Sequence, residues 1–281
     1  MMPPRHRFVS TNGLRLHYLE WGDAHRQPML LLHGSSAHAH WWDFFAPMFA
    51  EQYRVLALDL RGSGDSQWAD PPDYEIAAHA TDVCGVVQAL ELRRLVLVGH
   101  SLGGLVAILS AARLIDRMNA LVLVDTAARI SARGARYMEA LRRLPQPRYA
   151  SLEEAVHRFR LMPIANEAQP EVLAHVARHA VRESDDGSWT LKFDRSGLGI
   201  NRACDLVPNL SALPIPLLLV RGAHSSTFSS HAFADLAARC PAAKMVEIAN
   251  AHHHVMLDAP EPLAAAVTEF LSEVHARAAA F

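Results

Sequence analysis

The 281-residue sequence has few cysteines, little net charge and no long apolar run. Its three cysteines (Cys84, Cys204 and Cys240) are odd in number and far apart, which argues against a disulfide framework. The net charge of −2 gives no reason to expect nucleic acid or an acidic membrane surface as a partner. Because no apolar run is long enough for a membrane span, and residues 1–13 do not look like a signal peptide, we expect a cytoplasmic protein.

What the sequence does contain is a series of short, nearly continuous apolar runs: PMLLLHG, YRVLALD, RRLVLVGH, ALVLVDTA, PIPLLLVRG and AKMVEIAN. Strands that lack an alternation of apolar and polar residues are buried on both faces, as in a parallel sheet covered by helices. Helical patterns such as IAAHATDVCGVVQAL lie between most of the runs. At the start, FVSTNGLRLHYLEWG predicts a hairpin that turns at Asn12-Gly13. The sequence therefore predicts an α/β protein with a mostly parallel, doubly wound sheet.

The alternation stops between LVLVDTA and PIPLLLVRG, where about eighty residues contain no convincing core strand. This stretch holds several prolines and amphipathic pieces such as SLEEAVHRFRLM, which opens with Ser151 and Glu154 in the spacing of a capping box. A structureless loop of this length is implausible in a compact domain. We therefore predict a helical cap inserted at residues 128–205, over one end of a sheet formed by residues 1–127 and 206–281.

The strongest chemical signal is LVLVGHSLGGLVAIL, in which Gly99-His100-Ser101-Leu102-Gly103 joins a buried strand directly to a helix. A serine in such a sharp turn projects its hydroxyl above the sheet, and the strained turn requires very small flanking residues. The pentapeptide alone is moderate evidence, since a glycine-rich packing turn can look the same. Its place between a strand and a helix makes it a strong indication of a nucleophilic serine.

With this motif the sequence resembles the α/β-hydrolase fold superfamily, in particular its capped, esterase-like members. LLLHGSSAHAHWW is similar to the family's His-Gly loop after the third strand, and LALDLRGSGDS to its Asp-x-Arg-Gly-x-Gly-x-Ser loop after the fourth. ANAHHHVMLDAPEPL is similar to the loop that carries the catalytic histidine. The motifs follow the family's order over nearly the whole chain, which implies the α/β-hydrolase fold. For the Asp59–Gly62 loop we expect a structural role, bracing the loops around the site.

The resemblance implies that Ser101 is the nucleophile and that a histidine removes its proton. The family's histidine usually stands seven residues before a proline that opens the final helix, and counting back from Pro260 gives His253. Three consecutive side chains cannot all face one nucleophile, so we expect His252 and His254 to pack or to face solvent. For the same reason a metal site at the three histidines is disfavoured, and we expect no metal and no cofactor.

The resemblance also implies an oxyanion hole, made by the backbone N–H groups of Leu102 and Ser35. Trp41 is a further candidate for contact with the substrate. His33, His38 and His40 in the same loop are candidates for the pocket lining, although a histidine in a loop is more often polar filler.

The third member of a catalytic triad is missing from its usual place. In most members of the superfamily the acid follows the core strand that comes after the insertion. It lies three or four residues beyond a glycine at the end of that strand. Counting from Gly222 gives Ser225 and Ser226, and neither can carry a negative charge. A second carboxylate position known in the superfamily, at the end of the strand after the nucleophile's helix, corresponds here to Asp125. We predict Asp125 as the acid; a structural carboxylate is the alternative. Less well placed alternatives for the acid are Asp205 and Asp258.

The nature of the nucleophile restricts the substrate. A serine argues against dehalogenase or epoxide hydrolase chemistry and favours acyl transfer to water. Residues 129–202 hold twelve arginines and one lysine against nine acidic residues, so a basic cap could attract a carboxylate-bearing substrate. Arg129, Arg133 and Arg136 are the best candidates for such a contact, and solvated helix faces are the alternative.

We therefore predict a cofactor-independent serine hydrolase that cleaves a carboxylic ester or lactone through Ser101, His253, Asp125 and an acyl-enzyme. Its partner is a small-molecule substrate, and a homodimer stays open. The alternative reaction is hydrolysis of an amide or of a carbon–carbon bond in a small acidic metabolite. An alternative of another class, invited by the vacant acid position, is a non-catalytic binding or receptor protein on the same fold.

Overall fold

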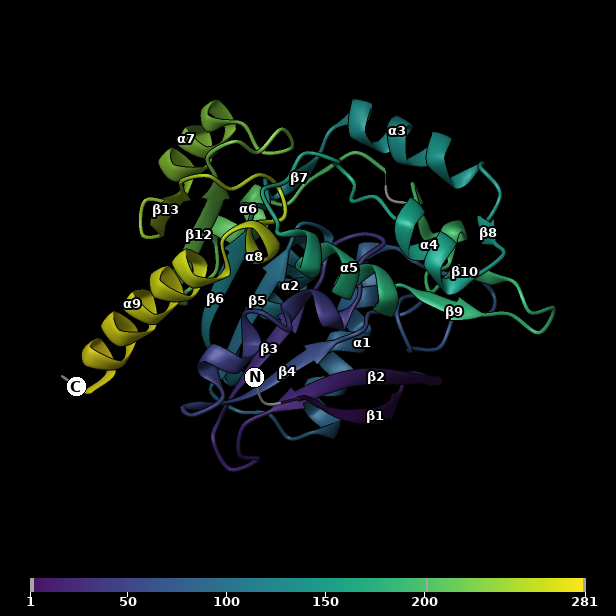
Figure 1. The fold of residues 1–281 in the computed structure, drawn as a ribbon. Helices are drawn as coiled ribbons and strands as arrows, with labels where there is room; N and C mark the ends of the chain where they lie inside the picture. Colours follow the sequence, from purple (N-terminus) through teal and green to yellow (C-terminus); the bar gives the residue numbers. More distant parts are fainter. Residues whose placement is uncertain (1–2, 201, 280–281) are drawn as a thin grey trace.

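A computed structural model describes residues 3–200 and 202–279, and its centre is an eight-stranded sheet (Figure 1). In spatial order the strands are β1 (Arg5–Thr11), β2 (Leu14–Trp21), β4 (Tyr53–Leu58), β3 (Gln27–Leu32), β5 (Leu95–His100), β6 (Met118–Val124), β12 (Leu217–Gly222) and β13 (Lys244–Ile248). From β4 to β13 all neighbours are parallel, and β2 is antiparallel to both of its neighbours. The mostly parallel sheet is therefore confirmed. The predicted hairpin is confirmed too, with φ angles of 51° at Asn12 and 77° at Gly13.

Helices cover both faces of the sheet, which explains the unbroken apolar runs of its strands. In β3, Met29 and Leu31 pack into one hydrophobic core, whereas Leu30 and Leu32 pack into the other. The first core includes α9 (Pro260–Ala279) and the 3₁₀ helices η1 (Ala39–Trp42) and η2 (Ala46–Phe49). The second includes α1 (Ile76–Ala89), α2 (Leu102–Arg113), α6 (Val207–Ser211) and α7 (Ser230–Arg239). The side chains on both faces of a central strand are thus buried.

Between β6 and α6 the chain leaves the main sheet. Residues 128–205, called here the inserted segment, contain α3 (Ala132–Arg142), α4 (Leu152–Arg158) and α5 (Pro170–His179). Figure 1 shows α3 and α4 beyond one end of the sheet, and α5 lies against η1. As the capping-box spacing predicts, the Ser151 hydroxyl accepts a hydrogen bond from the Glu154 N–H at the start of α4.

Besides its helices, the inserted segment contains short strands that the sequence does not predict. Three short antiparallel strands, β8 (Arg148–Tyr149), β10 (Trp189–Leu191) and β9 (Val181–Glu183), form a sheet of their own. A further pair, β7 (Arg129–Ile130) and β11 (Cys204–Asp205), joins the two ends of the segment. Strands of two or three residues are too short to show a periodicity in the sequence. The domain boundaries at residues 128 and 205 stay a prediction, and they fall beside this last pair.

Two further expectations concern cysteines and membranes. Cys84, Cys204 and Cys240 are free thiols. Within residues 3–200 and 202–279, no helix combines the length and the apolar character that crossing a membrane requires.

The turn from β5 into α2 packs so tightly that its glycines cannot be replaced without movement of the backbone. A Cβ on Gly103 would lie 2.4 Å from the carbonyl oxygen of Leu32, and one on Gly99 would lie 2.5 Å from that of Gly103. These contacts press the start of α2 against the end of β3. The turn between β5 and α2 is therefore closely constrained by its packing.

We expect Gly103→Ala to lower the free energy of unfolding by about 1–3 kcal/mol, because the clashing atoms belong to the backbone. Gly134→Ala, in the exposed helix α3, is the matched control and should change stability by less than about 1 kcal/mol. Among the described residues, its new Cβ would meet the Ser131 hydroxyl alone, at 3.3 Å. Urea unfolding of both variants measures the difference, and equal stabilities would contradict the packing argument.

Candidate active site

Ser101 lies at the junction of β5 and α2, in a backbone conformation that few residues other than glycine adopt. Its φ and ψ angles are 52° and −115°, and its N–H donates a hydrogen bond to the Val124 carbonyl oxygen at 3.2 Å. The tight packing of Gly99 and Gly103 holds this conformation in place. The hydroxyl therefore emerges from a rigid turn at the end of a buried strand.

His253, in the loop between β13 and the short helix α8 (Val255–Asp258), faces Ser101. Its Nε2 lies 3.1 Å from the Ser101 hydroxyl oxygen, and its Nδ1 lies 2.7 Å from Oδ2 of Asp125. A carboxylate can only accept, so Nδ1 carries the hydrogen and Nε2 is free to accept from the Ser101 hydroxyl. Asp125, His253 and Ser101 thus form a continuous chain of hydrogen bonds.

The two neighbouring histidines point elsewhere. The His252 ring lies 3.5 Å from the carboxylate of Glu167, and its backbone N–H donates to Asp258. His254 is buried and donates from Nε2 to the carbonyl oxygen of Pro163. Burial, and then the neighbouring His253, lower the pKa of His254 to about 3, so its ring is neutral. The structure thus brings only His253 of the three to Ser101, as the count from Pro260 predicts.

Asp125 follows β6 directly and is buried, with a φ of 45°. Its Oδ1 accepts a hydrogen bond from the backbone N–H of Gly222 at 2.9 Å. The alternative acids lie apart from this contact: Asp205 accepts from the Val207 N–H, and Asp258 accepts from His252 and Glu167. Of the three carboxylates proposed from the sequence, Asp125 is the one that contacts His253.

The stretch where the acid is usually found hydrogen-bonds to Asp125 instead. The Ser225 hydroxyl donates to Oδ2 of Asp125 at 2.6 Å, and the Thr227 hydroxyl donates to the same oxygen at 3.1 Å. Thr227 also lies 2.7 Å from Nδ1 of His253, while Ser226 is exposed. Thr227 is a site residue that the sequence reasoning missed, because counting from Gly222 tested only the two positions where the family usually has its acid.

The two predicted oxyanion donors lie beside Ser101 in the cavity wall. Ser35 and Leu102 both line the cavity, and Leu102 opens the twelve-residue helix α2. Neither backbone N–H donates to another group in the part of the chain that the structure describes. Two unused N–H groups at a helix N-terminus and its neighbouring loop suit a developing negative charge.

A cavity of about 480 Å³ opens above Ser101, between the core and the inserted segment. Trp41 lines it, as expected, and so does Arg129. Most of the remaining large lining residues are apolar: Leu105, Ile130, Met138, Met162 and Leu198. A cavity of this size can hold a small organic molecule.

Several residues expected at the cavity lie elsewhere. Arg133 and Arg136 are exposed on α3 and are not among the lining residues, because the helix turns Gly134, Ala135 and Met138 toward the cavity instead. The Arg129 guanidinium at the cavity is paired with Asp235 at 3.0 Å.

The three histidines of the loop after β3 are also outside the cavity lining. His33 accepts from the Leu60 N–H, His38 donates to the Val176 carbonyl oxygen, and His40 donates to Asp43. Each ring is buried and forms a hydrogen bond to the protein rather than facing the cavity, although Nδ1 of His38 has no partner among the described residues.

The Asp59–Gly62 loop makes the bracing contacts that were expected of it. The buried carboxylate of Asp59 accepts from the Ala39 N–H at 2.6 Å and from His17 at 2.7 Å. Burial alone would raise the pKa of Asp59, but the His17 hydrogen bond and charge hold it below its usual range. Arg61 forms two hydrogen bonds with Asp82, at 2.6 and 2.7 Å. These contacts tie the loops after β3 and β4 together.

Groups of histidine and carboxylate side chains that could hold a metal ion occur at several places among the described residues. One group, His100, His253 and His254, belongs to the site above. Another lies between η1 and α5, away from the cavity lining, and consists of His40, Asp43, His175 and His179. The sequence reasoning missed this group. Its signals were the i, i+3 spacing of His40 and Asp43 and the i, i+4 spacing of His175 and His179.

Comparison with known proteins gives a consistent result. The sequence model of the Alpha/beta hydrolase family matches residues 29–266. The chain is 26% identical over 276 residues to a serine hydrolase-like protein of Danio rerio, covering 89% of this chain and 83% of that protein. It is 29% identical over 249 residues to esterase Rv0045c of Mycobacterium tuberculosis, covering 87% and 82%. A structure of that esterase has a TM-score of 0.79 at 25% identity, covering 97% of this chain and 93% of that one.

A third relative is the 2-(acetamidomethylene)succinate hydrolase of Mesorhizobium japonicum, 26% identical over 247 residues, which covers 86% of this chain and 87% of that protein. A crystal structure of E-2-(acetamidomethylene)succinate hydrolase has a TM-score of 0.86 at 23% identity, covering 96% and 99% of the two chains. At that identity the structural likeness shows a shared fold.

We expect a fluorophosphonate probe to label Ser101 covalently, because His253 can remove the hydroxyl proton as the oxygen attacks phosphorus. Intact-protein mass spectrometry should find one adduct per chain, none in Ser101→Ala, and a labelling rate at least about 100-fold lower in His253→Ala. His252→Ala is the matched control and should label at nearly the rate of the unmodified protein. Undiminished labelling of Ser101→Ala would rule out this serine as the nucleophile.

Proposed function

This chain belongs to the α/β hydrolase family, and we propose that it is a serine hydrolase that cleaves carboxylic esters through Ser101, His253 and Asp125. The observation that carries the proposal is the hydrogen-bond chain from Asp125 Oδ2 through both ring nitrogens of His253 to the Ser101 hydroxyl. A chain of this kind activates a serine that would otherwise be inert at neutral pH.

Each group has a definite part in the proposed reaction. The Ser101 oxygen attacks the ester carbonyl carbon while Nε2 of His253 takes the hydroxyl proton. The negative oxygen of the tetrahedral intermediate is stabilised by the N–H groups of Leu102 and Ser35. Collapse of the intermediate expels the alcohol, which receives the proton from His253, and leaves an acyl group on Ser101. Water then attacks the acyl-enzyme with His253 again as base, which releases the carboxylic acid and regenerates the serine hydroxyl.

The cavity favours a neutral substrate of modest size. Its large lining residues are mostly apolar, and Arg129 is the only arginine or lysine among the described lining residues. That guanidinium already pairs with Asp235 at the surface, and both side chains are about two-fifths exposed, at 39% and 45%. A small ester or lactone with an apolar acyl or alkyl group fits these walls best. Likeness to an esterase supports the same substrate class.

Hydrolysis of an amide in a carboxylate-bearing molecule is the second candidate. It is favoured by Arg129 in the cavity wall and by the relative named for hydrolysis of 2-(acetamidomethylene)succinate. The same serine, histidine and oxyanion donors would serve, with an amine in place of the alcohol as leaving group. The contact between Asp125 and His253 argues against a purely non-catalytic binding role, because it supplies the carboxylate that Ser225 lacks.

Asp125→Asn should lower kcat for a p-nitrophenyl ester by about 10³- to 10⁴-fold with KM little changed. The amide keeps the shape of the carboxylate but cannot stabilise the imidazolium, and it can favour the wrong tautomer of His253. Ser225→Ala removes one hydrogen bond to the carboxylate and leaves its charge in place, so kcat should fall less than about tenfold. Steady-state kinetics of the two variants decide the matter. Near-full activity in Asp125→Asn would place the acid elsewhere.

Arg129→Leu should raise KM for a carboxylate-bearing ester up to about fivefold, the range of a partly exposed ion pair, and leave KM for a neutral ester unchanged. Arg133→Leu and Arg136→Leu are matched controls, because they remove the same charge from outside the cavity lining. They should leave the ratio of the two KM values as it is. If all three variants shift the ratio equally, the effect comes from the overall charge of the inserted segment.

A further inference from the structure

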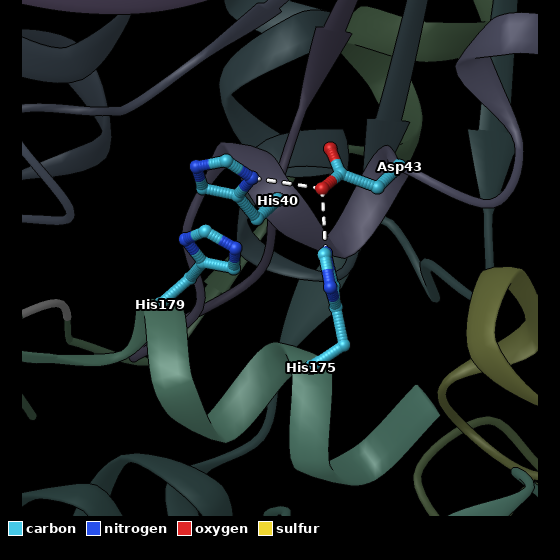
Figure 2. A group of neighbouring side chains, drawn as sticks. All are labelled: His40, Asp43, His175 and His179. Atoms are coloured by element: carbon cyan, nitrogen blue, oxygen red, sulfur yellow. Dashed lines mark hydrogen bonds and ion pairs between the residues drawn. The ribbon is translucent and has the colours of Figure 1, made fainter. Parts of the chain in front are cut away.

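A compact group of four side chains, from η1, the residue after it and α5, joins the core to the inserted segment. Figure 2 shows His40 and Asp43, from η1 and the residue that follows it, facing His175 and His179 of α5. The two histidines of α5 are one helical turn apart and therefore project from one face of the helix. None of the four residues lines the cavity above Ser101.

The four side chains converge on one point. Oδ2 of Asp43 accepts hydrogen bonds from Nδ1 of His40 at 2.8 Å and from Nε2 of His175 at 2.6 Å. The His179 ring lies against the His40 ring, with 3.6 Å between centroids and 15° between planes. One nitrogen or oxygen from each of the four residues lies within 4.8 Å of all the others.

These separations are close to those of a tetrahedral metal site. An ion with four ligands at about 2.0–2.1 Å holds those ligands about 3.3 Å apart. The hydrogen-bonded atoms would have to separate by about 0.5–0.7 Å, and the more distant pairs would have to approach, to meet that spacing. Side-chain rotation alone can supply such movements, since His175 is only partly buried and His179 sits at the end of α5.

Two groups in the cluster have no hydrogen-bond partner among the described residues. In the part of the chain described, neither ring nitrogen of His179 takes part in a hydrogen bond or ion pair, although the ring stacks on His40. Asp43 is only 8% exposed, and its buried Oδ1 has no hydrogen-bond partner among the described residues. A buried polar atom without a partner is costly, and this one belongs to the carboxylate at the centre of the cluster.

We propose that His40, Asp43, His175 and His179 form a binding site for one divalent metal ion such as Zn²⁺ or Co²⁺. The bound ion stabilises the contact between the inserted segment and the core. Three imidazoles and one carboxylate suit such an ion, whereas Mg²⁺ and Ca²⁺ prefer ligand sets made of oxygen. On binding, Nδ1 of His40 and Nε2 of His175 give up their hydrogens to the other ring nitrogen and coordinate the ion. The hydrogen bonds to Asp43 are thereby replaced by bonds to the metal.

The position of the site indicates a structural effect beside the cavity. The contact between η1 and α5 also includes the His38 hydrogen bond to the Val176 carbonyl oxygen at 3.1 Å. Trp41, within η1, lines the cavity and is next in sequence to His40. An ion bound by both elements stabilises their contact, because it binds the folded arrangement and not the unfolded chain.

The test is a titration of the full chain, without a polyhistidine tag and after dialysis against a chelator, with Co²⁺. Tetrahedral Co²⁺ gives intense visible absorption bands, and we expect them to saturate at one ion per chain and to disappear when Zn²⁺ is added. Zn²⁺ should also raise the melting temperature. Absence of these bands at micromolar Co²⁺ would overturn the proposal.

Variants locate the ion. His179→Ala breaks no hydrogen bond, so it should fold, and it should weaken Co²⁺ binding at least about 100-fold, the upper end of what loss of a supporting contact costs. His179→Gln is a second variant that keeps more of the side-chain volume. His231→Ala removes an exposed histidine, and His224→Ala disrupts a separate group formed with Glu167 and His252. Both controls should bind Co²⁺ as the unmodified protein does. Unchanged binding in the His179 variants, or loss of binding in His224→Ala, would show that the ion sits elsewhere.

Discussion

The site depends on one buried carboxylate that is held by donors from several separate parts of the chain. Asp125 ends β6, and its two oxygens accept from the Gly222 N–H, the hydroxyls of Ser225 and Thr227, and the His253 ring. An ionised carboxylate is costly to bury unless its lone pairs are satisfied, and these four donors satisfy them. The loop after β12, which carries an acid in most relatives of this fold, here provides the hydroxyls that hold an acid from the neighbouring strand.

The same arrangement explains why strain can persist at two adjacent strand ends. Ser101 and Asp125 both have positive φ, at 52° and 45°. Such strained conformations persist only where several independent contacts hold the backbone in place. Ser101 is fixed by the glycines that flank it and by its N–H bond to Val124, and Asp125 by its N–H bond to the Val220 carbonyl oxygen and by its four donors. Ser101 and Asp125 are therefore both held by a constrained backbone, with His253 between them.

Sequence reasoning succeeded where the signal was local. Continuous apolar runs predicted the buried strands, and Asn12-Gly13 predicted the hairpin. The position of His253 came from its distance to Pro260 along the chain, and the interest in Asp125 came from the vacancy at Ser225. The hydrogen bonds that join Asp125, His253 and Ser101 agree with what the resemblance implies, and the catalytic roles of these residues stay a prediction. What the sequence could not give is the direction of a side chain on an irregular element, which is why Arg133 and Arg136 were expected at the cavity and lie outside it.

Contacts between distant parts of the chain were beyond reach for a different reason. Asp43 and His175 are 132 positions apart, and no periodicity relates them; only the packing of α5 on η1 brings them together. That packing also determines the shape of the cavity. The core supplies Ser101, His253 and Trp41 to its lining, and the inserted segment supplies most of the apolar wall opposite them. The positions of Ser101, His253 and Asp125 thus depend on the sheet, whereas the shape of the cavity depends on how the inserted segment packs against the core. The cluster of three imidazoles and one carboxylate lies at this contact. An ion bound there, as we propose, would therefore act on the shape of the cavity without any change at Ser101, His253 or Asp125.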